Sequence, residues 1–276
     1  MSCLLQISDP HFGTEQPDVL RALEQLAAAL APGVVVLSGD ITQRATAAQF
    51  AAARAFADRL GRPVLAIPGN HDIPLFQLAA RVFAPYGRYC RAFGDDLEPT
   101  FESREWLVAT VNTTRWYRHE DGAVSAEQIE RVARRLAQAS PSQVRVVVTH
   151  QPVMVTRGQD LGNRLHGREQ AVARWCAAGA DLILGGHIHL PFVRPLHDAF
   201  PGCAPTAWAV QAGTATSTRV RAGHPNSVNV VHADIAGGAD GRRACRVERW
   251  DYVARDKAFG CAEVFGLSLA SEAVQP

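Results

Sequence analysis

Gly69-Asn70-His71-Asp72 is the stretch of sequence on which the interpretation of this chain depends. It follows an apolar run over residues 63–67 and a proline, which is the pattern of a buried strand that ends in a turn. Three polar side chains therefore stand at the carboxyl end of a strand, the edge at which open α/β sheets bind ligands. Taken alone, the stretch also fits an ordinary turn, because Pro-Gly-Asn favours turns.

Four other predicted strands end in the same way. Residues 3–8, 34–38, 144–149 and 181–184 are apolar runs typical of buried strands, and each is followed by Asp or His. One such motif is more often structural than functional, but five in one chain favour a shared site. The residues concerned are Asp9, His11, Asp40, Asn70, His71, His150, His187 and His189.

The segments between these strands predict helices, so the chain is expected to be of the α/β class. Pro17 suits the first position of a helix, Thr46 can cap a second one, and Ser125 with Gln128 forms a capping box. The repeated order of strand, polar tip and helix indicates βαβ units around parallel strands.

The remaining segments are less regular. Residues 74–82 predict a helix, residues 85–99 a loop, and residues 100–111 a pair of strands. From residue 191 onward the pattern changes to short β segments separated by Gly, Pro and Asn turns. These segments cover about 191–194, 207–211, 227–233 and 244–253, with a turn at 237–241, and we interpret them as an antiparallel extension of the sheets.

The composition is that of a globular protein, with 276 residues, 47% of them hydrophobic, and a formal net charge of +1. A near-neutral charge argues against a protein whose main task is to grip nucleic acid or an anionic membrane. The sequence has neither a secretory signal pattern nor an apolar run of about 20 residues, so no membrane anchor is expected. The six cysteines are scattered, which favours thiols in a reducing cytoplasm.

The polar strand ends have the chemistry of metal ligands. Leaving His71 aside, they offer two carboxylates, one amide oxygen and four imidazoles, which is more than one tetrahedral zinc site needs. Two divalent ions about 3.5–4 Å apart that share a bridging carboxylate would use all seven groups. The donor set suits manganese or iron first, and also zinc or cobalt.

The order of these motifs resembles that of the calcineurin-like metallophosphoesterase superfamily. Within it, the chain is most similar to the bacterial cyclic-nucleotide phosphodiesterase and glycerophosphodiesterase branch, the class III phosphodiesterases. The superfamily motifs are Asp9-x-His11, Gly39-Asp40, Gly69-Asn70-His71-Asp72, His150 and Gly186-His187-x-His189, and the branch features are residues 7–13, 213–217 and 225–227.

The resemblance implies a four-layer α/β/β/α sandwich with two mixed β-sheets and a dimetal site at the strand ends. The whole chain, residues 1–276, is then expected to form a single domain. Residues 1–190 carry the metal motifs, and residues 191–276 are expected to complete the second sheet and to form a C-terminal tail.

The resemblance also implies a role for each ligand. Asp9, His11 and His189 would bind the first metal, Asn70, His150 and His187 the second, and Asp40 would bridge the two. A hydroxide between the ions would be the nucleophile. His71 would stabilise or protonate the leaving oxygen, and Asp72 would either orient the ring of His71 or cap a helix.

The implied function is hydrolysis of a phosphodiester, with a 3′,5′-cyclic nucleotide as the first candidate. A phosphomonoesterase or a glycerophosphodiesterase of the same fold is the alternative. A non-catalytic binding scaffold belongs to a different class, and the complete ligand set argues against it. The expected partner is a small phosphodiester rather than nucleic acid. A homodimer is also possible, because the last forty or so residues could exchange with a neighbouring subunit.

Substrate contacts are expected from Asn70 and His71, and the further candidates are Arg115, Arg164 and His166. Both arginines lie in polar segments near the metal motifs, and a guanidinium can bind phosphate with two hydrogen bonds. A solvated surface arginine is the competing interpretation. The histidines outside the motifs, His119, His197, His224 and His232, are interpreted as structural.

Overall fold

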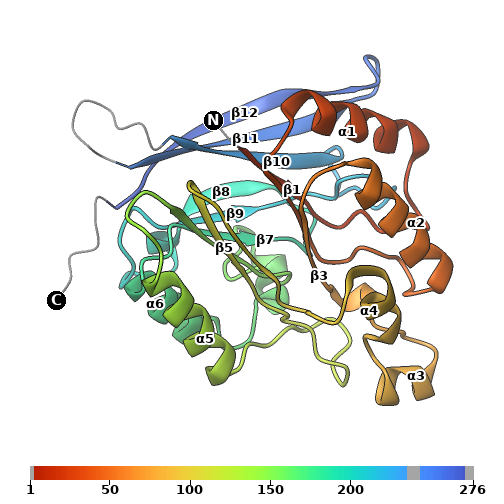
Figure 1. Cartoon of the computed structure of the whole chain (residues 1–276), viewed down its shortest axis with the longest axis horizontal. Coiled ribbons are helices and arrows are strands. Elements are labelled where there is room, and N and C mark those ends of the chain that lie inside the picture. Colours follow the sequence, from red (N-terminus) through yellow and green to blue (C-terminus); the bar gives the residue numbers. More distant parts are fainter. Residues whose placement is uncertain (1–2, 235–242, 271–276) are drawn as a thin grey trace.

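The computed structural model describes residues 3–234 and 243–270, so the turn expected at 237–241 lies outside the described residues. Within these residues the strands form two six-stranded mixed sheets, and helices cover both outer faces (Figure 1). The chain thus has the α/β/β/α architecture that the resemblance implies.

The first sheet contains the N-terminal strands and the last three strands, in the order β12-β11-β10-β1-β2-β3. β1 (Cys3–Ile7), β2 (Val34–Ser38) and β3 (Val64–Ile67) are parallel. β10 (Ser227–Asp234), β11 (Ala244–Val253) and β12 (Ala258–Ser268) run antiparallel to their neighbours. α1 (Pro17–Leu30) and α2 (Ala47–Arg59) cover the outer face of this sheet (Figure 1).

The second sheet has the order β4-β5-β6-β7-β9-β8. β5 (Trp106–Thr110), β6 (Val144–Val148), β7 (Leu182–Gly185) and β9 (Trp208–Gln211) are parallel. β4 (Thr100–Glu102) and β8 (Phe192–Pro195) are antiparallel edge strands. The outer helices are α5 (Ala126–Ala137) and α6 (Arg168–Ala177), and short 3₁₀ turns occupy Asn70–Asp72, Gly158–Asn163 and Leu196–Asp198.

Three apolar cores hold the four layers together, because successive strand residues point to opposite faces of a sheet. Leu5 of β1 packs in the core beneath α1 and α2, whereas its neighbour Leu4 packs between the two sheets. In the second sheet, Val146 of β6 faces the first sheet and Val147 faces α5 and α6. Burial of each such side chain contributes about 1.5–3 kcal/mol, so both faces of both sheets stabilise the sandwich.

The C-terminal third differs from the expectation. Only β8 and β9 complete the second sheet, whereas β10 pairs with β1 and extends the first sheet. The last forty residues also include β12, an 11-residue strand that the sequence pattern does not predict and that pairs along β11. Neighbours in a sheet are set by long-range pairing, which the local pattern does not carry.

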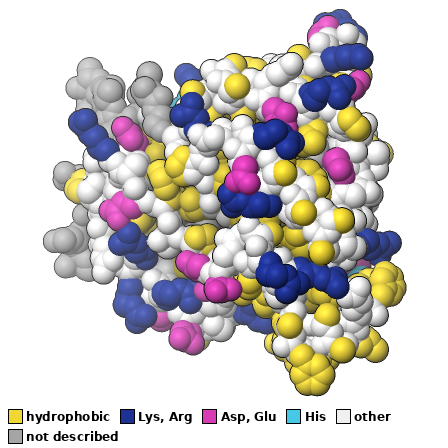
Figure 2. Space-filling view, turned by 45° about the vertical axis from the view of Figure 1, so that its right-hand side comes forward, with side chains coloured by type: hydrophobic (Ala, Val, Ile, Leu, Met, Phe, Trp, Pro, Cys, Tyr) yellow, Lys and Arg dark blue, Asp and Glu magenta, His cyan; other side chains and the backbone are white. Residues whose placement is uncertain are grey.

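The segment after the Asn70–Asp72 turn also differs. The first helix there, α3 (Leu78–Phe83), begins later than expected, and α4 (Gly87–Phe93) replaces the expected loop. α4 is fixed by Tyr89, whose buried hydroxyl donates to the carbonyl of Ala66 at 2.6 Å. α3 has no buried residue, and Figure 2 shows hydrophobic side chains gathered on the surface at this corner of the molecule, where Phe83 is 85% exposed.

Among the described residues, no helix combines the length and the apolar composition needed to cross a bilayer.

Candidate metal centre

The polar strand ends of both sheets meet in one cluster. Hydrogen bonds fasten the strand ends to one another: Asp9 N donates to the carbonyl of Gly39 at 3.1 Å, and Gly186 N donates to the carbonyl of His150 at 2.9 Å. β1, β2 and β3 contribute from the first sheet, and β6 and β7 from the second. The contributed residues are Asp9, His11, Asp40, Asn70, His150, His187 and His189.

Five of these seven residues have a left-handed backbone. The φ angles are 52° at Asp9, 46° at His11, 47° at Asp40, 74° at His187 and 53° at His189. Residues other than glycine rarely adopt such angles, and where they do, they gather at functional sites. With these backbone angles, the side chains of residues 9 and 11, and of residues 187 and 189, all reach the cluster.

Asp40 stands between two groups of ligands. Its Oδ1 lies 3.2 Å from Nε2 of His150, and its Oδ2 lies 3.8 Å from Nε2 of His11. On the first side, Nε2 of His189 lies 3.2 Å from Oδ1 of Asp9 and 3.2 Å from Nε2 of His11. On the second side, Nε2 of His150 also lies 3.2 Å from Oδ1 of Asn70. One carboxylate with an oxygen toward each group is the arrangement of a bridging ligand.

The cluster fits metal ions on two further observations. Atoms of Asp40, His150 and His187 that can bind a metal all lie within 4.8 Å of one another, as do those of Asp9, His11 and His189. Nδ1 of His187 is buried and has no hydrogen-bond partner among the described residues. A buried nitrogen without a partner is costly, and a metal ion at this position would satisfy it.

Backbone carbonyls fix the orientation of the imidazoles. Nδ1 of His150 donates to the carbonyl of Ser38 at 2.9 Å, and Nδ1 of His189 donates to the carbonyl of Arg219 at 2.7 Å. In the neutral imidazole, each bond leaves the lone pair on Nε2, the atom that faces the cluster. Such outer contacts set the tautomer of a ligand and raise its basicity.

The protonation of the cluster in the absence of metal follows from burial and charge. Burial works against the charged form of Asp40, but the neighbouring His150 outweighs it and holds the pKa of Asp40 well below its usual range. Burial also opposes charge on His150, yet Asp40 raises the pKa of His150 to about 9. Burial lowers the pKa of His11 to about 3 and that of His187 to about 4. At neutral pH, His150 therefore carries a proton that a metal ion must displace.

His71 lies at the rim of the cluster. Its backbone N–H donates to Oδ1 of Asp40 at 2.8 Å, and its ring stands edge-on to that of His11 with centroids 4.8 Å apart. Nδ1 of His71 lies 3.0 Å from the carbonyl of Gln43. When Nδ1 donates to that carbonyl, Nε2 is left for other contacts.

Asp72 does not orient the ring of His71, so this expectation is wrong. Both carboxylate oxygens of Asp72 accept backbone hydrogen bonds, from Ile41 N at 3.0 Å, Thr42 N at 2.7 Å and Gly69 N at 2.8 Å. Burial and the charge of Asp40 raise the pKa of Asp72 to about 6, against the effect of these bonds. Asp72 is thus a cap that joins the Asn70–Asp72 turn to the loop after β2.

The three further candidates for substrate contact have other partners. The guanidinium of Arg115 donates to Gln128 Oε1 at 2.7 Å and to the carbonyl of Thr114 at 2.7 Å. Arg164 donates to the carbonyl of Leu161, and His166 pairs its backbone with the segment around Ala123. None of these contacts involves a residue of the cluster. The physical reason is that the loops carrying these residues form their hydrogen bonds within themselves and with segments outside the cluster.

Two residues near His71 are missed by the sequence analysis. Arg219 lies with Nη1 3.0 Å from Nε2 of His71, and only its position shortly after the 213–217 motif could have drawn attention to it. His119, interpreted above as structural, lines a small hollow of about 20 Å³ beside His71. The other residues of this hollow are Gln43, Arg44, Asn70, Ile73 and Leu75.

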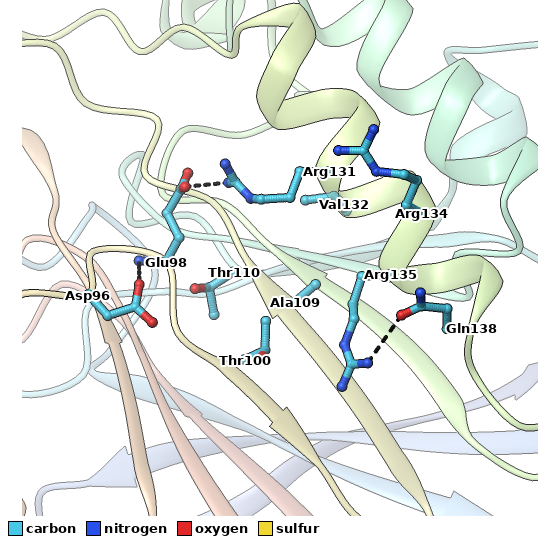
Figure 3. A pocket seen from close by; sticks show the side chains of 10 residues that line it. All are labelled: Asp96, Glu98, Thr100, Ala109, Thr110, Arg131, Val132, Arg134, Arg135 and Gln138. Carbon is cyan, nitrogen blue, oxygen red and sulfur yellow. Dashed lines mark hydrogen bonds and ion pairs between the residues drawn. The ribbon is translucent and has the colours of Figure 1, made fainter.

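A much larger hollow, of about 540 Å³, lies between β4, β5 and α5, and none of its lining residues belongs to the cluster (Figure 3). Several of its charged groups have partners of their own. Glu98 forms an ion pair with Arg131 and accepts a hydrogen bond from Asn112 N at 2.9 Å. Arg135 pairs with Glu102. These contacts tie α5 to the sheet edge, which is a structural role.

Comparison with known proteins agrees with this site. Residues 4–191 match the model of the calcineurin-like phosphoesterase family. The chain belongs to this family and is a hydrolytic enzyme acting on phosphoesters. A protein of Synechococcus sp. described as a "Probable cyclic nucleotide phosphodiesterase" is 27% identical over 218 residues, which are 74% of this chain and 80% of that protein.

Solved structures support the fold. A dimetal phosphatase from Danio rerio superposes with a TM-score of 0.66 at 12% identity, covering 98% of this chain and 99% of that one. A purple acid phosphatase from yellow lupin gives a TM-score of 0.69 at 14% identity and covers 97% of this chain, which spans only 53% of the lupin chain. At these identities the likeness concerns the fold alone.

Gly69→Ala is expected to disrupt the centre without unfolding the protein. A Cβ at Gly69 would overlap the backbone nitrogen and Oδ1 of Asp40, and backbone atoms cannot yield cheaply. We expect metal affinity to fall about 10- to 100-fold, as when the support of a ligand is removed. Gly158→Ala is the matched control, because a Cβ there meets no atom within 4 Å. Equal metal content in both variants, by elemental analysis, would contradict the close packing of Gly69 on Asp40.

Metal affinity is expected to rise with pH between 6 and 8. Below its pKa of about 9, His150 is protonated in the absence of metal, so each unit of decreasing pH lowers the apparent affinity by up to about tenfold. Calorimetric titration with Mn²⁺ in buffers of different ionisation enthalpy measures both the affinity and the proton release. His150→Gln should flatten the dependence, and His224→Gln, outside the cluster, should keep it. An affinity independent of pH in the wild type would refute this assignment.

Proposed function

We propose that this enzyme hydrolyses a small phosphodiester, with a 3′,5′-cyclic nucleotide as the first candidate, and that it uses two divalent ions. Manganese and iron are the first candidates for the ions, and zinc or cobalt the next. The observation that carries the proposal is the position of Asp40, which offers one oxygen to each of two ligand groups, with His71 at the rim.

The ligand residues would form two sets, one on each side of Asp40. Asp9, His11 and His189 would hold one ion, and Asn70, His150 and His187 the other. When bound, two such ions supply Lewis-acid polarisation of phosphoryl oxygens and a water activated for attack. The carbonyls of Ser38 and Arg219 keep the imidazoles of His150 and His189 in the tautomer that this requires.

His71 would act on the leaving group. Hydrolysis forms a bond between a water oxygen and phosphorus and breaks the bond from phosphorus to the leaving oxygen, which then needs a proton. The carbonyl of Gln43 holds Nδ1 of His71, and the backbone bond to Asp40 fixes the residue at the rim. Nε2 is therefore the atom that would hold the proton for the leaving oxygen, a contribution of about 10²–10⁴-fold to the rate.

The choice of a diester rests on the Synechococcus relative and on composition. That relative shares 27% identity with most of the chain. The net charge of +1 gives little support to a long nucleic acid as substrate. A phosphomonoester is the alternative within the fold. A cytoplasmic location and a homodimer remain predictions from the sequence.

Metal-stripped protein refilled with Mn²⁺ tests the proposal. We expect it to cleave bis(p-nitrophenyl) phosphate faster than p-nitrophenyl phosphate, and then to cleave 3′,5′-cyclic AMP or GMP. Asp40→Ala should lose both metal and activity, whereas His71→Ala should keep its metal and lose about 10²–10⁴-fold in kcat. His166→Ala is the control and should match the wild type, because its contacts lie outside the cluster. A faster monoesterase reaction would move the assignment to a phosphatase.

A further inference from the structure

The loop that follows β9 is fastened to the N-terminal metal motif. Thr214 Oγ1 donates to the carbonyl of Asp9 at 2.6 Å, and Thr216 Oγ1 donates to the carbonyl of Pro10 at 3.0 Å. Ala215 N donates to the carbonyl of Ser8 at 2.9 Å. Residues 213–217 are thus held against the segment that bears Asp9 and His11. These contacts fix the backbone shortly before Arg219.

Arg219 stands at the end of this loop. Its backbone N–H donates to Ser217 Oγ at 3.1 Å, and its carbonyl accepts the hydrogen bond from His189 described above. The backbone of Arg219 is therefore part of the support of the centre. Its side chain, in contrast, is exposed and extends over the rim, with Nη1 3.0 Å from Nε2 of His71 and 3.2 Å from Oε1 of Gln43.

The contact with His71 involves the atom that the proposed reaction needs. A guanidinium only donates hydrogen bonds and stays protonated, so Nε2 of His71 must accept this bond. A proton on Nε2 would face the guanidinium donor directly. The side chain of Arg219 must therefore leave Nε2 before His71 can give a proton to a leaving oxygen.

The part of the chain that the structure describes offers Arg219 no negatively charged partner. No carboxylate forms an ion pair with Arg219 among the residues that the structure describes. Its present acceptors are both neutral, an imidazole and an amide, whereas a phosphate group carries negative charge and can accept two hydrogen bonds from one guanidinium. An anionic phosphoryl group that arrives beside His71 would be the better acceptor.

We propose that Arg219 binds the phosphoryl group of the substrate, exchanging its hydrogen bonds to His71 and Gln43 for bonds to non-bridging oxygens. This inference rests on the proposed function and adds to it a cationic side chain at the rim of the cluster that binds the substrate. The exchange has two results: it holds the ester in place, and it frees Nε2 of His71 for the leaving group.

The test compares Arg219→Met and Arg219→Lys with the wild type, all loaded with Mn²⁺. Met keeps most of the length and removes the charge, and Lys keeps the charge and loses the forked donors. We expect Arg219→Met to raise KM for bis(p-nitrophenyl) phosphate and the dissociation constant of inorganic phosphate by about 10- to 100-fold each. Arg219→Lys should recover part of both losses, and kcat should change less than KM.

Two controls separate this effect from others. Arg255→Met removes a positive charge at an 85% exposed side chain in the β11–β12 turn, and it should leave both constants unchanged. Elemental analysis should find wild-type metal content in both Arg219 variants, because the carbonyl that orients His189 remains.

Three outcomes would overturn the inference. The first is unchanged phosphate binding in Arg219→Met, with kcat alone reduced, which would make Arg219 only a partner of His71. The second is loss of metal in both Arg219 variants. The third is an equal effect of Arg255→Met. If the wild type cleaves no diester while Arg219→Met still weakens phosphate binding, the proposed function fails and the role of Arg219 stands.

Discussion

The centre depends on one buried carboxylate. Asp40 is 2% exposed, and each of its oxygens faces a different set of ligands. A buried carboxylate is tolerable only with partners, and the protein supplies them from three directions: His150, His11 and the backbone N–H of His71. The missing side chain of Gly69 belongs to the same arrangement, because it lets the third strand end approach Asp40. The Gly-Asp motif and the Gly-Asn-His-Asp motif therefore pack directly against each other, and each needs the other in place.

The fold allows strained ligand positions because it is rigid beneath them. Left-handed angles at residues other than glycine cost about 1–3 kcal/mol each and persist where the surroundings leave no alternative. Here the strand ends rest on two cores that meet at β1, with Leu5 in one and Leu4 in the other. The strain at Asp9 and His189 is therefore borne by layers packed mainly with apolar side chains. In each strand, a few residues thus connect the packing of the apolar core to the positions of the metal ligands.

The sequence was sufficient for the features that depend on local pattern. Apolar runs ending in Asp, His or Asn predicted both the parallel strands and the residues that the structure brings together. The sequence was insufficient where contacts with a distant segment determine the structure. The pairing of β10 with β1 is of this kind, and so is the position of Arg219, which depends on bonds from Thr214 and Thr216 to the N-terminal motif. Sequence left two roles open for Asp72, to orient the ring of His71 or to cap a helix, and could not decide between them because the 3₁₀ turn directs the carboxylate to residues 41 and 42, far away in the chain.

The ligands come from both sheets, and this has a mechanical consequence. His11 and His189 are 178 residues apart in the chain, and their imidazole nitrogens are 3.2 Å apart in space. Ions held there would act as a cross-link between the first sheet and the second, beside the loop from β9 to β10 that also joins the two sheets at this end. An ion that binds only the folded chain shifts the unfolding equilibrium by mass action. In this enzyme, the supply of metal would thus set the stability of the folded protein as well as its activity.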